Sequence, residues 1–247
     1  MKVRCSSLLF LLATILITAG CAHNKTIDGF NASEWFEMGR QASIDNRLDN
    51  ALDAYNKAIE LDPKVAKIYI NRGRTYYYLG NYNQAIADYN KVVELDPEDT
   101  ETYINRGNAY DRLGNYNQAI ADYNKVIESD PKDSETYVSR GNAYDSLGKY
   151  KQAISDYDKA MELNPKNIHA YVNRGGTYVK FGNYNQAIAD YDKAIELNTE
   201  FALAYYNRGL AYSAFGNHNQ AIADWKIAAS LGLKETQDYL KQQGIAW

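Results

Sequence analysis

From residue 32 onward the chain repeats itself every 34 residues, and this period constrains its fold more than any other feature. Six blocks follow one another, with the same residue types at the same places in each. Self-similarity at such a period is typical of stacked repeats, in which each unit buries its apolar face against its neighbours. The blocks cover residues 32–65, 66–99, 100–133, 134–167, 168–201 and 202–235.

The third block shows the shared pattern most completely. It contains Tyr103, Gly107, Tyr110, Gly114, Tyr116, Ala119, Tyr123 and Pro131. A 34-residue unit with aromatic, Gly, Ala and Pro residues in this order resembles the tetratricopeptide repeat. The resemblance covers nearly all of the chain after residue 31. It implies an all-α fold, a right-handed α-solenoid of six helix pairs, with a C-terminal capping helix and tail in residues 236–247.

Single residues predict where the helices begin and end. Gly80 follows the first helix of its block, where a left-handed cap is expected. Asn83 is placed to cap the second helix, and Pro97 falls where that helix must stop. Asn31 with Glu34 resembles a capping box at the start of the first block.

Tyrosine is unusually frequent, with 23 Tyr against 6 Phe. Nineteen of them fall at the fourth, eleventh, seventeenth or twenty-fourth position of a block. We interpret this tyrosine lattice as packing between helices, since these are packing positions of the repeat. Gly at the eighth position and Ala at the twentieth predict a close approach of the two helices. Tyr77, Tyr78 and Tyr206 lie off the lattice and are available for another role.

An arginine at the seventh position is followed sixteen residues later by an aspartate in every block but the first. In two helices joined by a short turn these positions lie at similar height, so we predict a structural ion pair inside each helix pair. Block one has Met38 and Ala54 instead and so lacks both partners. The pairs are Arg72 with Asp88, Arg106 with Asp122, Arg140 with Asp156, Arg174 with Asp190, and Arg208 with Asp224.

The first residues have the build of a secretory signal peptide. Lys2 and Arg4 precede an apolar run from Leu8 to Ile17, and small residues follow it. The run is too short to span a bilayer, which takes about 20 apolar residues. We predict that residues 1–20 are a signal peptide.

The sequence Thr-Ala-Gly-Cys at residues 18–21 resembles the bacterial lipobox. The resemblance implies a lipid thioether on Cys21, cleavage before it, and acylation of the new amino terminus; ordinary cleavage with Cys21 as a bystander is the alternative. Residues 21–31 are then the lipidated cysteine and a short polar tether, ten residues of which reach at most about 35 Å. The expected location is the bacterial cell envelope, at the outer membrane facing the periplasm in a Gram-negative host.

No constellation of catalytic residues is evident. The three His have no second His or Cys at metal-ligand spacing, and no glycine-rich phosphate loop occurs. We therefore predict that the protein is not an enzyme and uses no cofactor apart from the lipid on Cys21. A net charge of −4 without a Lys/Arg cluster disfavours nucleic acid as a partner.

Family resemblance places the first helix of each pair on a concave face that suits a peptide or protein ligand. We expect a membrane-anchored scaffold, similar to repeat lipoproteins that assist pilus or secretin assembly or recruit peptidoglycan-modifying enzymes. A self-assembling envelope protein and a binder of glycan or another small ligand remain open. The predicted groove residues are Arg74, Tyr77, Tyr78, Ile104, Asn108, Asp111, Arg112, Val138, Asn142, Asp145, His169, Val172 and Tyr206.

Overall fold

The computed structural model describes residues 25–247; residues 1–24, which hold Cys21 and the predicted signal peptide, lie outside the described part. The predicted all-α fold is confirmed, with thirteen helices and no strand between residues 25 and 247. The helices are α1 (Ala32–Ile44), α2 (Leu48–Leu61), α3 (Ala66–Tyr78), α4 (Tyr82–Leu95), α5 (Thr100–Arg112), α6 (Tyr116–Ser129), α7 (Ser134–Ser146), α8 (Tyr150–Leu163), α9 (Ile168–Lys180), α10 (Tyr184–Leu197), α11 (Ala202–Ala214), α12 (His218–Ser230) and α13 (Lys234–Gln242).

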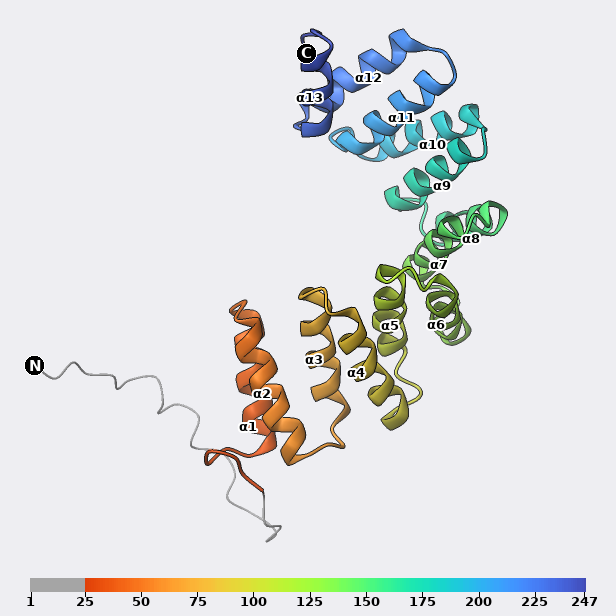
Figure 1. Cartoon of the computed structure of the whole chain (residues 1–247). Coiled ribbons are helices and arrows are strands. Elements are labelled where there is room, and N and C mark those ends of the chain that lie inside the picture. Colours follow the sequence, from red (N-terminus) through yellow and green to blue (C-terminus); the bar gives the residue numbers. More distant parts are fainter. Residues whose placement is uncertain (1–24) are drawn as a thin grey trace, which may run out of the picture.

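Consecutive helices form pairs, α1 with α2 through α11 with α12, and the pairs stack into an arc that α13 ends (Figure 1). The first helix of each pair also contacts the first helix of the next pair, from α1 and α3 through α9 and α11. These odd-numbered helices line the inner side of the arc, and their partners form the outer side. The solenoid therefore has a concave face built from α1, α3, α5, α7, α9 and α11.

Each pair is closed where a glycine of the inner helix meets an aromatic ring of the outer helix. A Cβ on Gly107 would lie 2.7 Å from the ring of Tyr123, closer than real atoms approach. Glycine at the eighth position is therefore required by the aromatic ring at the twenty-fourth position, and not only by the close approach of the helix that carries Ala119. The same contact joins Gly39 to Tyr55, Gly73 to Tyr89, Gly141 to Tyr157, Gly175 to Tyr191, and Gly209 to Trp225.

The turn inside each pair after the first is set by a glycine in the left-handed region; in the first pair Asn46 takes this place, with φ +56°. Gly80 has φ +77°, and the amides of Gly80 and Asn81 donate to the carbonyls of Tyr77 and Tyr76. This Schellman-type closure confirms the predicted cap. The predicted capping role of Asn83 is wrong. The tight closure lets α4 begin at Tyr82, so Asn83 already lies in the helix; the N-cap is Asn81, whose side chain makes no capping hydrogen bond.

The segment before α1 folds back onto the first pair instead of extending as a tether. The backbones of Ile27 and Phe30 bond each other at 3.0 Å, and Trp35 Nε1 donates to the Ile27 carbonyl at 3.0 Å. Lys57 Nζ pairs with Asp28 at 2.7 Å. We call residues 27–30 the N-terminal clasp. The prediction that the chain is a free tether as far as residue 31 is therefore wrong, because an indole donor and an ion pair hold the clasp.

The two ends of the solenoid are closed by local features. The predicted capping box at α1 is confirmed, with Asn31 accepting from Glu34 N and Glu34 Oε2 accepting from Asn31 N at 2.8 Å. At the other end α13 buries Leu240 completely against the last pair. Within residues 25–247, none of the helices combines the length and apolarity needed to cross a bilayer.

Candidate functional site: the concave face

Five arginines of the inner helices bind aspartates of their partner helices. Arg106 donates from Nε and Nη2 to the two carboxylate oxygens of Asp122, at 2.8 and 2.6 Å. The hydrogen bond to Asp122 raises the pKa of Arg106, and Asp122 is only 4% exposed. The same two-point geometry joins Arg72 to Asp88, Arg140 to Asp156, Arg174 to Asp190, and Arg208 to Asp224.

Each of these arginines also forms a hydrogen bond to the preceding helix pair, a contact that the repeat pattern did not predict. Arg106 Nη1 donates to Asn90 Oδ1 on α4 at 2.8 Å. The acceptors occupy the twenty-fifth position of the preceding block, which becomes Lys226 in the last block, where no arginine follows. The loss of this acceptor in the one block that no arginine follows was the sequence signal for the contact between pairs. The five acceptors are Asn56, Asn90, Asn124, Asp158 and Asp192.

The tyrosine lattice packs against this scaffold: seven of its nineteen members are buried and the other twelve are half-buried. Tyr123 is 2% exposed, and its hydroxyl donates to Asn108 Oδ1 at 2.8 Å. Tyr157 donates to Asn142 in the same way. Burial raises the pKa of both tyrosines. Asn108 and Asn142, predicted to face a ligand, therefore also hold the hydroxyls of buried rings.

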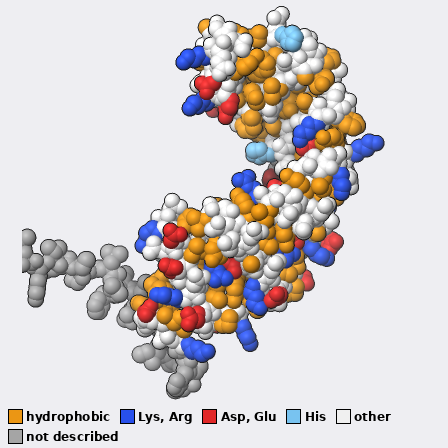
Figure 2. Space-filling view, viewed as in Figure 1, with side chains coloured by type: hydrophobic (Ala, Val, Ile, Leu, Met, Phe, Trp, Pro, Cys, Tyr) orange, Lys and Arg blue, Asp and Glu red, His pale blue; other side chains and the backbone are white. Residues whose placement is uncertain are grey.

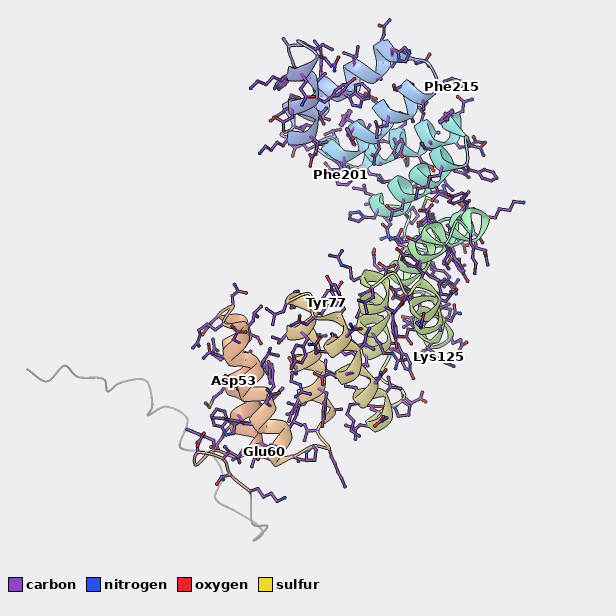
Figure 3. All side chains as sticks on the ribbon, in the orientation of Figure 1. Asp53, Glu60, Tyr77, Lys125, Phe201 and Phe215 are labelled. Carbon is purple, nitrogen blue, oxygen red and sulfur yellow. The ribbon has the colours of Figure 1, made fainter. Side chains whose placement is uncertain are left out.

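The other predicted groove residues differ in exposure. Val138 does not lie on the groove surface: it is 5% exposed and packs with Tyr137 and Tyr157, because the next helix pair covers its position. Val172 is also buried, at 6% exposure. Tyr77 lies on α3 at the inner side of the arc (Figure 3). Tyr78, Arg112 and His169 are exposed, whereas Arg74, Tyr77, Ile104, Asp111, Asp145 and Tyr206 are half-buried.

The inner side of the arc is hollowed (Figure 2), and one hollow, which we call the Arg74 hollow, lies between α3 and α5. Arg74 forms an ion pair with Glu101 at its surface. The amide nitrogen of Asn105 is buried and has no acceptor among residues 25–247. The hollow measures about 180 Å³ and is lined by Arg74, Tyr77, Tyr78, Tyr89, Asn105 and Asn108.

A larger hollow, which we call the Gly176 hollow, spans α7, α9 and α11 and measures about 350 Å³. Asp145 accepts from Thr177 Oγ1 at 2.8 Å and pairs with Lys180. Asn173 donates to Asn142 at 2.8 Å. Three inner helices therefore contribute side chains to one site. Its lining is Asn142, Asp145, Ser146, Tyr157, Val172, Asn173, Gly176, Thr177, Lys180, Leu203 and Asn207.

Protein-family models match most of residues 25–247 of the chain. A model described as TPR repeat matches residues 44–77, 73–114 and 176–216. Two models described as tetratricopeptide repeat match residues 100–133 and 134–167, and residues 156–189. Among curated proteins, no significant match to the sequence is found.

Solved structures with the same fold are numerous. A crystal structure of MamA is 30% identical, with 67% of this chain and 96% of MamA covered and a TM-score of 0.60. A tetratricopeptide repeat protein from Parabacteroides merdae is 27% identical, with 87% and 84% covered and a TM-score of 0.68. The type IV pilus biogenesis factor PilW shares the fold at 18% identity, with 85% and 98% covered and a TM-score of 0.72.

Proposed function

Since the chain belongs to the tetratricopeptide repeat family, we propose that it is a scaffold whose concave face binds a peptide or protein partner without catalysing a reaction. The observation that carries this proposal is that different side chains of the inner helices hold the scaffold together and line the concave face. The lattice tyrosines pack between helices, and the arginine–aspartate pairs join the two helices of a pair. Other side chains of the same inner helices line two hollows that the scaffold does not fill.

The alternatives gain less support from the same observations. A glycan site would stack sugars on exposed aromatic rings, but each lattice tyrosine is buried or half-buried, and of the off-lattice tyrosines only Tyr78 is largely exposed, at 77%. Self-assembly by continued stacking would need free ends, and α13 covers the last pair, where it buries Leu240. Light scattering of the purified protein tests self-assembly directly.

The partner site can be tested by exchanging exposed groove residues that the scaffold does not use. Tyr78→Glu and His169→Glu together add two negative charges to exposed positions of the inner helices, and each removes only one edge-to-face ring contact, with Tyr77 and with Phe201. Proteins crosslinked to the wild-type chain in the native envelope should be lost from the double variant, as identified by mass spectrometry. Lys125→Glu, on the outer side of α6 (Figure 3), is the matched control and should keep them. Equal capture by all three chains contradicts the groove proposal.

We also propose that the scaffold is anchored in the bacterial envelope through a lipid on Cys21. Support comes from the lipobox-like sequence at residues 18–21. Two or three acyl chains hold a protein firmly, because each buried CH₂ contributes about 0.8 kcal/mol. We expect mass spectrometry of the N-terminal peptide from the native host to show an acylated peptide that begins at Cys21. A peptide with a free Cys21 thiol contradicts the anchor and leaves the groove proposal intact.

A further inference from the structure

The Arg74 hollow lies where one repeat position replaces a hydrogen-bond acceptor by a donor. At the ninth position, block four holds Asn142, whose Oδ1 accepts from the Tyr157 hydroxyl and from Asn173 Nδ2, both at 2.8 Å. This one oxygen joins the buried ring of its own pair to the asparagine at the sixth position of the next inner helix. Block two holds Arg74 at the ninth position, and a guanidinium has no acceptor atom.

The two donors that such an oxygen would serve are still present beside Arg74. The corresponding ring is Tyr89, the corresponding asparagine is Asn105, and both line the hollow. The Asn105 amide nitrogen is buried without an acceptor among residues 25–247, and the Tyr89 hydroxyl has no hydrogen-bond partner in the same range. A buried donor without a partner costs free energy. The hollow therefore lacks one acceptor oxygen that two donors could share.

The first block shows that arginine at the ninth position does not by itself create this arrangement. Arg40 takes that position, but the Tyr55 hydroxyl shares a hydrogen bond with Ser43 Oγ at 3.2 Å. The next asparagine at a sixth position, Asn71, donates to a carbonyl of its own helix at 2.7 Å. Both donors near Arg40 are thus satisfied within the scaffold. The repeat pattern gives no account of the unpaired donors around Arg74.

Charge and size define the oxygen that fits. Arg74 places a positive charge where Asn108 and Asn142 are neutral. Glu101, whose side chain is 60% exposed, bonds the guanidinium at Nη2 and so shows that a carboxylate reaches this cation. The guanidinium carries five N–H donors, so others remain for a ligand. A cavity of about 150 Å³ can hold benzene, and the hollow of about 180 Å³ thus has room for a carboxylate.

We propose that the Arg74 hollow binds a carboxylate of the partner. One carboxylate oxygen accepts from Asn105 Nδ2 and from the Tyr89 hydroxyl, and Arg74 balances the charge. An Asp or Glu side chain and the C-terminal end of the partner chain both present this group. The inference rests on the proposed partner-binding function and names the chemical group that the groove selects.

The test begins with peptides selected from a synthetic library with free C-terminal ends, bound to the full-length protein in detergent. Each selected peptide is remade with Asn or Gln in place of its acidic residues, and separately with a C-terminal amide. One of the two changes should weaken binding at least tenfold, as expected for hydrogen bonds to a charged group. The change that does so identifies the source of the carboxylate.

Variants of the protein then locate the carboxylate. Arg74→Asn supplies an oxygen from the protein itself and should weaken binding at least tenfold. Tyr89→Phe removes only the hydroxyl and should weaken it several-fold. Glu101→Gln removes the competing carboxylate and should strengthen it. Arg40→Asn removes the same charge at the ninth position of block one, outside both hollows, and should bind like the wild type.

Thermal unfolding separates loss of the site from loss of the fold. Arg74→Asn should unfold at or above the wild-type midpoint, because the new oxygen pairs with the two donors. Selected peptides that bind equally well without their acidic residues and with a C-terminal amide overturn the inference alone, as does unchanged binding by Arg74→Asn and Tyr89→Phe. A library that yields no enriched peptide overturns the proposed function and this inference with it.

Discussion

At the scale of single residues, two adjacent glycines of α9 carry different constraints. The ring of Tyr191 occupies the space beside Gly175, whereas the space beside Gly176 is open toward the concave face. The repeat spacing predicted a close helix approach at Gly175, but it did not identify the ring that fills the space beside it. The eighth-position glycine recurs in all six blocks, but its aromatic partner lies sixteen residues away and becomes visible only when the pair is closed.

Alanine at each of the two positions should therefore have opposite effects on stability. Gly175→Ala forces a ring in the closed helix pair to move and should destabilise the protein by about 1–3 kcal/mol. Gly176→Ala removes flexibility from the unfolded chain and should stabilise it by about 0.5–1 kcal/mol. Urea unfolding of the two variants measures both changes. A stabilising Gly175→Ala would show that the ring contact does not fix the pair.

At the scale of helices, the sequence predicted more within a block than between blocks. The turn at Gly80 and the capping box at Asn31 depend on residues a few positions apart, so a local pattern suffices. The bond from Arg106 to Asn90 crosses to the preceding pair, and the burial of Val138 depends on a neighbouring pair. This hydrogen bond and this burial could not be predicted from the spacing of residues inside one block, because they depend on how neighbouring helix pairs stack.

The arginines should couple helices within a pair and between pairs. A double-mutant cycle with Arg140→Ala and Asp156→Ala should give a coupling energy of about 1–3 kcal/mol, because the pair is largely desolvated. The cycle with Arg140→Ala and Asn124→Ala should give a smaller value, about 0.5–1.5 kcal/mol, as for a single hydrogen bond. Chemical unfolding of the single and double variants measures both. A coupling near zero at Asp156 would refute the structural pair.

At the scale of the whole molecule, five buried tyrosines make the solenoid sensitive to alkali. Burial raises the pKa of each of them in the folded protein, while the unfolded chain keeps the ordinary value of about 10. Stability is therefore fully present below about pH 10 and is lost as the pH rises above it, because only the unfolded chain then releases these protons. The five are Tyr55, Tyr89, Tyr123, Tyr157 and Tyr191.

An alkaline titration checks this expectation with two signals. Helical circular dichroism should disappear in the same pH interval in which the buried tyrosines become ionised, as followed by tyrosinate absorbance. Tyr123→Phe and Tyr157→Phe together remove two of the five groups and should move the transition to higher pH. Complete tyrosine ionisation with intact circular dichroism would show that the rings titrate in the folded state.

The N-terminal clasp has a consequence for how a partner would be met. With a lipid on Cys21, only residues 21–26 separate the anchor from the clasp, a span of about 20 Å at most. The first helix pair would then remain beside the bilayer, and the groove would be confined to a thin layer next to the membrane surface. A ligand fixed in the same membrane would meet the groove at a high effective concentration, so modest intrinsic affinity would suffice for stable capture.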